Sequence, residues 1–591
     1  MAGNLAYKLK ELSYTELLKA NTALSKTSFD KEFTIDILSN ITVNPIKEIL
    51  DFIIRSLSLN PVVRFGNYDN IVQDSFTLKS TDAVIVFYEL INLSEDFHLT
   101  AELLSEPEIQ EVIAKCKNDI NIIFSNLADK PLVIFNKFSS YHFSSSIHPP
   151  KNLERIAGEL NAYLVSNKPA NVSLLDINHV LYAVGAHEAL DKKKFARYKS
   201  LYKIEFLKHY VFSIQNVLLR RTGKLKKALI FDCDNTLWKG VIGEDGPEGI
   251  DMSAKSDEGK NYHLVQKIAA ELSRKGILIG LCSKNNSAEV EDLLSKHPDM
   301  VLNQEHLIAT KVNWNNKDEN LKALASELNI GLDSFVFIDD SAFEVNLIQT
   351  LLPEVLTIAV PKDINNYPAM ILEVAQRYFN PEPLQEDLNK LKSYKEQGKR
   401  AEAMNSIGDI DSYLATLDTK IVISKNKTEQ VPRIAQLTQK TNQFNLTTKR
   451  YTETDIANYL NDSATTVFTV DVSDKFGVSG ITGVAIVKEA QDDNKVMEID
   501  SYLLSCRVLG RKIEEAFLDY LVKYSKNKGY KTIRSKFIQT NKNNPAKDFY
   551  PDHQFEIENK SGNEVSYKLE TEKYQEKKTA FITLIEDQHK N

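Results

Sequence analysis

The feature that most constrains this chain is an apolar run that leads directly into two carboxylates, Ala228-Leu229-Ile230-Phe231-Asp232-Cys233-Asp234. The run predicts a buried β-strand. Because alternate residues of an extended chain point to the same side, Asp232 and Asp234 share one face and Cys233 points to the other. Neighbouring carboxylates repel each other, and burying them without a counter-charge is costly. The pattern therefore predicts a cation between them. Mg²⁺ is the candidate because it prefers hard oxygen ligands.

The chain has 591 residues, too many for one hydrophobic core, and we expect three α/β domains. Its composition, 42% hydrophobic and 26% charged, is that of a folded globular protein. The net charge of -8 disfavours binding to nucleic acid and to membrane surfaces. Residues 1–20 mix charged with apolar side chains, unlike a signal peptide, and no apolar run is long enough to span a bilayer. We therefore expect a cytoplasmic protein without nucleic-acid or membrane partners.

The first part of the chain predicts a helical segment at residues 1–30 and an α/β domain at residues 31–222. Helical patterns separate its strand-like segments, which indicates a parallel sheet with helices on both faces. The expected strands are 33–38, 62–65, 83–87, 132–135 and 172–176.

Polar residues follow several of these strands, at the edge where parallel sheets bind ligands. They are Ser39, Asn40, Asn92 and Asp176. The domain resembles the flavodoxin-like SGNH hydrolases. However, Leu38-Ser39-Asn40 stands where that family has its Gly-Asp-Ser nucleophile block, and Asp176 and His179 have only the spacing of its Asp-x-x-His pair. We therefore expect a degenerate domain used for binding or positioning, and expect His142 and His179 to be ordinary histidines.

Residues 223–385 predict a second parallel α/β domain, which begins with the strand before Asp232. A glycine-rich flap is expected at 240–246, a helix at 261–275 and a buried strand at 277–282. Ser283 follows that strand and Lys317 stands at the head of another helix. Both positions suit contacts with phosphate oxygens. A last apolar strand ends in Asp339 and Asp340.

The order of these residues resembles the haloacid dehalogenase (HAD) superfamily, with a Rossmann-like parallel sheet. The resemblance implies that Asp232 is the nucleophile that takes a phosphoryl group and that Asp234 is the general acid and then the general base. It implies that Thr236, Ser283 and Lys317 bind phosphate. The implied Mg²⁺ ligands are Asp232, the backbone carbonyl of Asp234, Asp339 and Asp340.

A charged helical linker is expected at 386–410, and a third domain with a mixed α/β sheet at 411–591, its polar tail frayed or a final strand. A strand at 496–504 and a helix at 513–528 flank Ser505-Cys506-Arg507-Val508-Leu509-Gly510-Arg511-Lys512. Amides at a helix start, with glycine for close approach, predict a phosphate cradle. This resembles the pyrophosphate-binding turn of GNAT-type acyltransferases. It implies that Arg507, Gly510, Arg511 and Lys512 bind coenzyme A or a phosphopantetheine arm.

Three longer segments, 232–246, 439–445 and 505–511, resemble the FkbH-like family. These proteins join an SGNH-like domain, a HAD domain of subfamily IIIC type and a GNAT-like domain, so the resemblance covers nearly the whole chain. Lys239 departs from it, since the family usually has glycine there. Members are associated with polyketide-type biosynthesis. The implied reaction takes a glyceryl unit from 1,3-bisphosphoglycerate, removes its remaining phosphate, and loads the unit onto the phosphopantetheine thiol of an acyl carrier protein.

Of the four cysteines, Cys506 is the predicted acyl-carrying thiol because Arg507, Arg511 and a helix start favour a thiolate. Burial disfavours Cys233 and Cys282. The alternative for Cys506 is a small buried core residue.

Other functions remain open. They are a Mg²⁺-dependent small-molecule phosphatase, an acyl-CoA-dependent acyltransferase acting on an amine such as an amino sugar, and a carrier-protein docking module whose acids bind Mg²⁺ only structurally.

Overall fold

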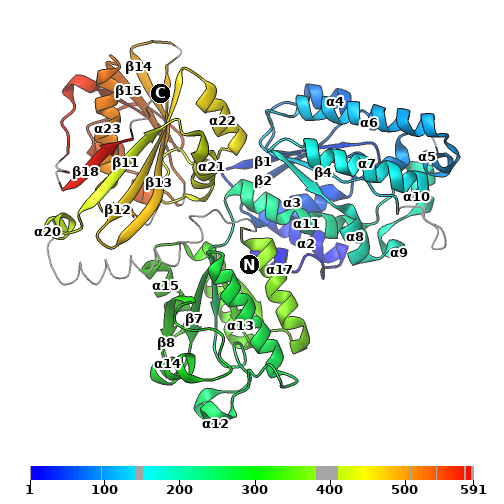
Figure 1. Ribbon diagram of the computed structural model, residues 1–591, viewed down its shortest axis with the longest axis horizontal. Helices are drawn as coiled ribbons and strands as arrows, with labels where there is room; N and C mark the ends of the chain where they lie inside the picture. The colour runs from blue at the N-terminus through cyan, green and yellow to red at the C-terminus, as the bar shows by residue number, and fades with distance from the viewer. Residues whose placement is uncertain are drawn as a thin grey trace. The chain divides into compact units, whose positions relative to one another are not determined.

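The computed structural model describes residues 2–94, 96–141, 151–380, 410–490, 492–505, 508–540, 542–577, 579 and 581–587. The chain divides into two compact units, Met1–Arg221 and Thr222–Asn591, and the second contains two separate β-sheets (Figure 1). The predicted multi-domain α/β fold class is confirmed. The predicted linker at 386–410 lies outside the described residues except for Ile410, with which α20 (Ile410–Ala415) begins.

The first sheet is parallel, in the order β2-β1-β3-β4-β5, as the alternation of strands and helices predicts. Its strands are β1 (Glu32–Ser39), β2 (Asn60–Phe65), β3 (Ala83–Phe87), β4 (Val133–Asn136) and β5 (Val172–Leu175). The central strand β3 is buried along its whole length because both of its faces carry apolar side chains.

Helices cover both faces of this sheet (Figure 1). Ala83, Ile85 and Phe87 belong to the core formed with α3 (Ile46–Ser56) and α11 (Ile204–Thr222). The alternate residues Val84 and Val86 belong to the core formed with α6 (Glu106–Asn126) and α7 (Lys151–Asn167). The strand period of two therefore divides one apolar run between two cores.

The N-terminal residues are helical, as predicted, and form α1 (Ala2–Tyr7) and α2 (Tyr14–Leu24). A capping box between Ser13 and Glu16 starts α2. Leu9 and Leu17 are fully buried in the same core as α3. The segment is therefore an integral part of the first unit.

A buried carboxyl group, Glu89, lies just after β3. Tyr202 and Asn136 are its hydrogen-bonding neighbours, and Tyr210 Oη donates to Asn136 Oδ1 at 2.8 Å. Burial raises the pKa of Glu89 to about 7, although these hydrogen bonds lower it. The folded chain therefore holds this proton at a pH where an unfolded chain has released it.

Glu89→Gln is expected to remove a pH-dependent loss of stability. Below the ordinary glutamate pKa, Glu89 is neutral in both states. As pH rises toward 7 only the unfolded state ionises, so the free energy of unfolding of the wild type falls by about 3 kcal/mol. The variant lacks this dependence. The pH dependence is measured by urea unfolding of the full chain at about pH 4.5 and pH 8. Hydrogen exchange of β3 peptides provides a second measurement. The matched control is Glu111→Gln on exposed α6 surface. The same dependence of the free energy of unfolding on pH in both variants would contradict the raised pKa of Glu89.

The second sheet is also parallel, in the order β10-β9-β6-β7-β8. Its strands are β6 (Ala228–Phe231), β7 (Leu278–Ser283), β8 (Leu307–Val312), β9 (Phe335–Asp339) and β10 (Leu356–Ala359). The carboxyl ends of neighbouring parallel strands meet at one edge, so the residues after β6, β7 and β9 come together there.

Helices α13 (Gly259–Arg274), α14 (Ser287–Lys296), α15 (Lys317–Glu327), α16 (Ala342–Leu351) and α17 (Tyr367–Tyr378) accompany this sheet. The predicted glycine-rich flap differs in detail, because its second half belongs to the short helix α12 (Ile242–Gly249). That helix is kinked at Gly246, whose φ is 66°. The Val241 amide donates to Asp245 Oδ2 at 2.8 Å, which supports the first turn of α12.

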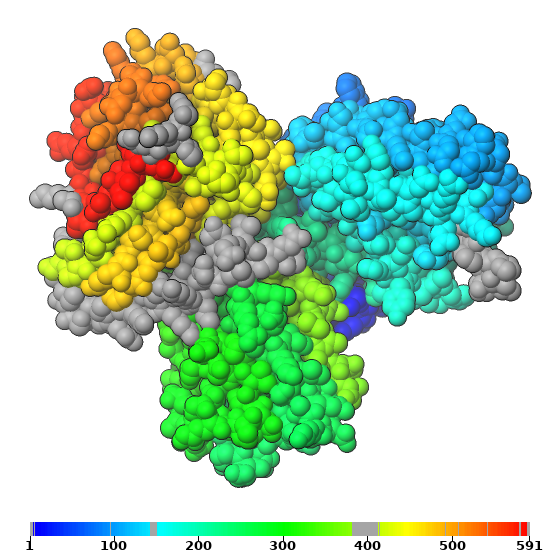
Figure 2. Space-filling view, in the orientation of Figure 1, coloured from blue at the N-terminus to red at the C-terminus, as the bar shows by residue number. Residues whose placement is uncertain are grey.

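The third sheet is mixed, in the order β16-β17-β15-β14-β13-β12-β11-β18. Its strands are β11 (Thr419–Lys425), β12 (Thr465–Asp474), β13 (Gly477–Glu489), β14 (Val496–Leu504), β15 (Thr532–Ile538), β16 (Glu556–Ser561), β17 (Glu564–Glu570) and β18 (Ile582–Glu586). The C-terminal tail was expected to be either frayed or a final strand, and it forms the strand β18. Figure 2 shows β18, in red, beside β11, with which it pairs in parallel.

Helices pack on both faces of the third sheet. Phe468 and Val470 of β12 belong to the core with α23 (Ile513–Asn527), as predicted for a helix at 513–528. The adjacent Val467 belongs to the core with α21 (Val431–Lys440) and α22 (Glu453–Asn461).

Among the described residues, none of the helices combines the length and the apolar character needed to cross a membrane.

Candidate active site

The second sheet brings together residues from distant parts of the sequence, between positions 232 and 339. Asp232 follows β6, Ser283 ends β7 and Asp339 ends β9. Lys317 is the first residue of α15. All four are at least nine-tenths buried. The parallel topology, rather than any local sequence signal, sets their proximity.

Lys317 lies between two of the carboxylates. Its Nζ is 3.0 Å from Asp232 Oδ1 and 2.6 Å from Asp339 Oδ2. Burial lowers the pKa of Lys317, but the two carboxylates outweigh it and the net pKa is raised. The ammonium group therefore stays charged and holds both carboxylates at the edge of the sheet.

Asp234 is held by a separate set of donors. Its Oδ1 accepts from Trp238 Nε1 at 2.9 Å and from the Ile242 amide at 3.1 Å, and its Oδ2 accepts from Asn285 Nδ2 at 2.8 Å. Burial raises the pKa of Asp234, and the charge on Asp232 adds to this, against the hydrogen bonds. A carboxyl group with a raised pKa and a fixed direction suits proton transfer.

Three carboxylates form a group that could hold a metal ion. One oxygen each of Asp232, Asp339 and Asp340 lie within 4.8 Å of one another. Burial and the charge on Asp232 raise the pKa of Asp339 to about 7, while Lys317 opposes the rise. Asp339 Oδ1 also accepts from the Ser341 amide at 2.9 Å. Such hard oxygen donors fit Mg²⁺. The side chain of Asp234 is engaged elsewhere, which leaves only its backbone carbonyl for the metal role expected of it.

The predicted phosphate contacts differ in their surroundings. Thr236 is fully buried, and in the described part of the chain its hydroxyl has no hydrogen-bond partner. Ser283 is 2% exposed and lies within hydrogen-bonding reach of the Cys233 thiol. Its place at the end of β7, beside Asp232, agrees with the expected position.

Two cysteines of this domain are buried and reduced, as expected. Burial first, and then the charge on Asp232, raise the pKa of the Cys233 thiol well above its usual range. Burial likewise raises the pKa of Cys282, whose Sγ is 3.7 Å from the Lys317 carbonyl oxygen. Neither is a thiolate at neutral pH. The predicted thiol Cys506, and with it Arg507, lies outside the described residues.

The remaining residues of the predicted cradle surround the start of α23. Gly510 is exposed with a φ of 75°, and Lys512 precedes the helix with a φ of 58°. Arg511 is 7% exposed, and its Nη1 lies 2.5 Å from Asp474 Oδ2. The guanidinium group is thus engaged with a carboxylate of the same domain.

In the first unit, the polar residues after the strands hold the turns together. Ser39 Oγ donates to the Ile41 carbonyl at 2.7 Å. Asn40 accepts from the Glu89 amide at 2.8 Å, and Asn92 donates to Tyr68 Oη at 2.9 Å.

The Asp-x-x-His residues of the first unit have local roles. Asp176 caps α8 (Ile177–Val184) and lies 3.7 Å from Lys137, and His179 is exposed. His142 lies outside the described residues. Ser39 therefore supports the turn after β1, and Asp176 the start of α8.

Three contributors to the site were not expected as such: Asn285, the indole N–H of Trp238 and the Ile242 amide. Trp238 lies four residues after Asp234 and Asn285 two after Ser283. A polar side chain in the loop after Ser283 is a signal that could have pointed to Asn285. The role of the Ile242 amide depends on the fold of the flap, which sequence does not reveal.

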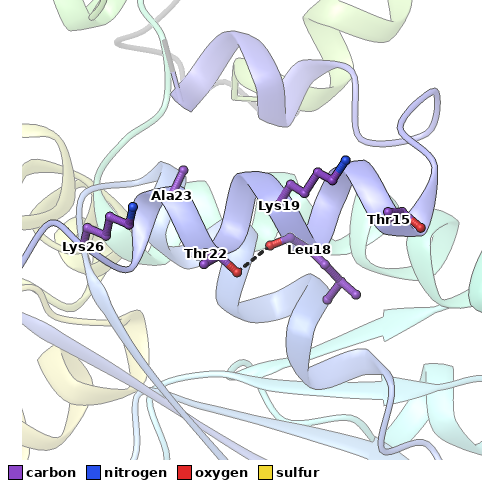
Figure 3. A pocket seen from close by; sticks show the side chains of 6 residues that line it. All are labelled: Thr15, Leu18, Lys19, Thr22, Ala23 and Lys26. Carbon is purple, nitrogen blue, oxygen red and sulfur yellow. Dashed lines mark hydrogen bonds between the residues drawn. The ribbon is translucent and has the colours of Figure 1, made fainter.

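A surface hollow on α2 has no comparable chemistry. It is lined by Thr15, Leu18, Lys19, Thr22, Ala23 and Lys26 (Figure 3). The Thr22 hydroxyl donates to the Leu18 carbonyl at 2.9 Å, as expected on an exposed helix face. The hollow has no acid or thiol, and we assign it no catalytic role.

Comparison with solved structures identifies the N-terminal part of the protein BF1531 from Bacteroides fragilis, which contains a phosphatase domain and was solved in complex with Mg. It is 21% identical, with a TM-score of 0.51, and the match covers 62% of this chain and 99% of that chain. At this identity the likeness shows the fold alone. The fold of the matched part of this chain is thus shared with a protein that contains a phosphatase domain.

Acetyltransferases are also among the structural neighbours. The IAA acetyltransferase from Bacillus cereus is 17% identical, with a TM-score of 0.20, over 25% of this chain and 99% of that chain. The paia N-acetyltransferase from Thermoplasma acidophilum, solved in complex with coenzyme A, is 18% identical, with a TM-score of 0.17, over 20% of this chain and 72% of that chain. TM-scores this low support no inference about this chain. No family model and no curated protein matches the chain.

Proposed function

We propose that the second domain is a Mg²⁺-dependent phosphatase with Asp232 as its nucleophile. The observation that carries this proposal is the buried set of Asp232, Lys317 and Asp339 at the end of a parallel sheet, with Asp234 oriented separately beside it. A group of acids that only bound a metal ion structurally would not need a further carboxyl group beside it, such as Asp234, with a raised pKa.

The residues divide the reaction between them. A carboxylate oxygen of Asp232 attacks phosphorus and forms the aspartyl phosphate, while the bond from phosphorus to the substrate oxygen breaks. Asp234 gives its proton to that leaving oxygen. Asp234 then takes a proton from water, which attacks the aspartyl phosphate and releases inorganic phosphate and free Asp232. Lys317 neutralises charge on the transferred group.

Asp232, Asp339, Asp340 and the backbone carbonyl of Asp234 would hold the Mg²⁺. When bound, the ion supplies charge neutralisation for the phosphoryl oxygens. Lys317 pairs with Asp232 and Asp339 and so orients both carboxylates.

The finer proposal is that this chain is FkbH-like and acts in the cytoplasm in polyketide-type biosynthesis. It takes a phosphoglyceryl unit from 1,3-bisphosphoglycerate, removes the remaining phosphate at Asp232, and loads the glyceryl unit onto the phosphopantetheine thiol of an acyl carrier protein. Support comes from the resemblance of segments 232–246, 439–445 and 505–511. Cys506 is the proposed carrier of the acyl group within the chain.

The test incubates the full-length protein with 1,3-bisphosphoglycerate, Mg²⁺ and a phosphopantetheinylated carrier protein. We expect phosphate release and a glyceryl-sized mass increase on the carrier. Cys506→Ala should abolish the mass increase but not phosphate release. Phosphate release without any adduct would reduce the function to the small-molecule phosphatase. An adduct on an amine with acyl-CoA as donor would instead favour the acyltransferase alternative.

Removal of Mg²⁺ with a chelator is expected to abolish phosphate release, and added Mg²⁺ to restore it. Saturating Mg²⁺ should also raise the unfolding temperature of the second domain by about 5 °C, because the ion binds only the folded carboxylate group. Differential scanning calorimetry measures the shift, with Asp340→Asn as the variant in which it should shrink. Asp292→Asn, on the exposed surface of α14, should keep the full wild-type shift, and equal shifts in the two variants would show a non-specific ion effect.

A further inference from the structure

The third sheet has an opening between β14 and β15. These parallel strands pair over four residues only, 496–499 with 532–535, and then separate. Separated strands leave backbone amides and carbonyls that need partners. An extended ligand that carries amides, such as a pantetheine arm, binds a sheet at such a place by adding a strand-like segment.

The chain's own segment 444–446 occupies this opening. The Leu446 amide donates to the Tyr502 carbonyl at 3.1 Å, and the Leu504 amide donates to the Phe444 carbonyl at 3.0 Å. On the other side, the Ile538 amide donates to the Leu446 carbonyl at 2.8 Å. The segment thus bonds to β14 and β15 together.

Side chains fix the segment in place. Phe444 is 6% exposed and packs against Phe549, with ring centroids 5.1 Å apart. Asn445 is fully buried, and its carbonyl accepts from Asn543 Nδ2 at 3.0 Å. Asn445 Oδ1 accepts from the Thr448 amide at 2.8 Å. These contacts are all internal to the third domain, so the segment is part of its core.

The predicted phosphate cradle is also occupied from within. The carboxylate of Glu514, in the first turn of α23, accepts hydrogen bonds from the amides of Gly510 and of Glu514 itself. Glu514 Oε2 is shielded from solvent and has no hydrogen-bond partner among the described residues, so one oxygen alone serves these amides. A carboxylate at these amides takes the position of a phosphate oxygen and repels a second anion. The nearby Arg511 is committed to Asp474.

We infer that the third domain does not take coenzyme A, because segment 444–446 fills the opening that a pantetheine arm needs and the Glu514 carboxylate fills the cradle that a pyrophosphate needs. The expected coenzyme A site of an acyltransferase is therefore closed by the chain itself. This does not depend on the proposed phosphatase. A carrier protein's pantetheine arm would need the same opening, so the proposed transfer to the carrier takes place outside it.

Titration calorimetry of the full-length protein with coenzyme A tests the inference. We expect no binding up to about 1 mM ligand. Hydrogen exchange should show slow amides in peptides that contain Leu446, Leu504 and Ile538, with rates that coenzyme A leaves unchanged. Binding with a Kd below about 100 μM would overturn the inference, as would fast exchange at Leu446. Phosphate release by the same sample is measured separately, so failure of the proposed phosphatase cannot be mistaken for this result.

The carboxylate in the cradle has its own test. Glu514→Ala should speed exchange of the Gly510 amide about tenfold, because that amide loses its acceptor. The matched control is Glu515→Ala in the same helical turn, which should leave the rate unchanged. Equal rates in both variants would show that Glu514 does not fill the cradle.

Discussion

Asp232→Asn is expected to lower the rate of phosphate release by at least about 10⁴-fold, because the amide cannot form the aspartyl phosphate. The fold should persist, since Lys317 keeps its 2.6 Å contact with Asp339. Single-turnover release of the 3-phosphate, from 1,3-bisphosphoglycerate labelled at that phosphate, measures the rate, because acyl transfer to a thiol releases only the 1-phosphate without Asp232.

Asp292→Asn is the matched control for this loss. Asp292 is an exposed aspartate of the same domain, paired with Lys296 one turn along α14. Its removal should leave the rate within about twofold of the wild type. If Asp232→Asn retained more than about a tenth of the activity, Asp232 would be a metal ligand without the nucleophilic role.

Lys317→Met is expected to lower activity strongly and to destabilise the second domain. The side chain is 5% exposed and lies between Asp232 and Asp339, so its loss leaves two buried carboxylates facing each other. Breaking a buried ion pair in this way costs about 3–5 kcal/mol. Loss of its charge at the transferred phosphoryl group should slow phosphate release about 10³-fold.

Adding Mg²⁺ distinguishes the effect of Lys317→Met on stability from its effect on activity. A bound cation replaces the missing positive charge, so urea unfolding in Mg²⁺ should recover part of the stability that is lost in a chelator, while activity stays low. Lys322→Met, one turn later on α15 and half exposed, is the control and should change neither quantity much. Equal stability of the two variants in the chelator would contradict a central role for Lys317.

Closure of the cradle in the third domain bears on the alternative functions. An acyl-CoA-dependent acyltransferase needs a place for the pyrophosphate, and the Glu514 carboxylate accepts from the amides that would provide it. The third sheet thus keeps the strand, turn and helix order expected from 496–528, while Glu514 and Arg511 interact with groups of the same domain. The fold of this domain therefore does not determine which ligand it binds.

The apolar strands and their acids were predictable because they are local. The run before Asp232 and the run before Asp339 each have the length and composition of a buried strand, and both strands are present as β6 and β9. The helix α23 and the strand β3, whose two faces are both apolar, also follow from the local sequence pattern alone. These features depend on residues that are neighbours in the chain.

Contacts between distant segments could not be read in this way. The 3.0 Å approach of Lys317 to Asp232 follows from the order of the strands, and the bond of Asn285 to Asp234 from the loop after β7. Sequence suggested Arg511 as an anion ligand, and only its distance to Asp474 shows how it is used. A charged side chain takes whichever partner the fold brings within reach.

The sequence by itself determined the carboxylates of Asp232 and Asp234, the strand that carries them and their common face, because alternation in a strand is a local property. Only the tertiary structure decided that Lys317 lies between Asp232 and Asp339, that Asp234 is held by three other donors, and that segment 444–446 closes the third sheet. Burial, ion pairing and strand order act between residues far apart in the chain, so they exist only once the chain has folded.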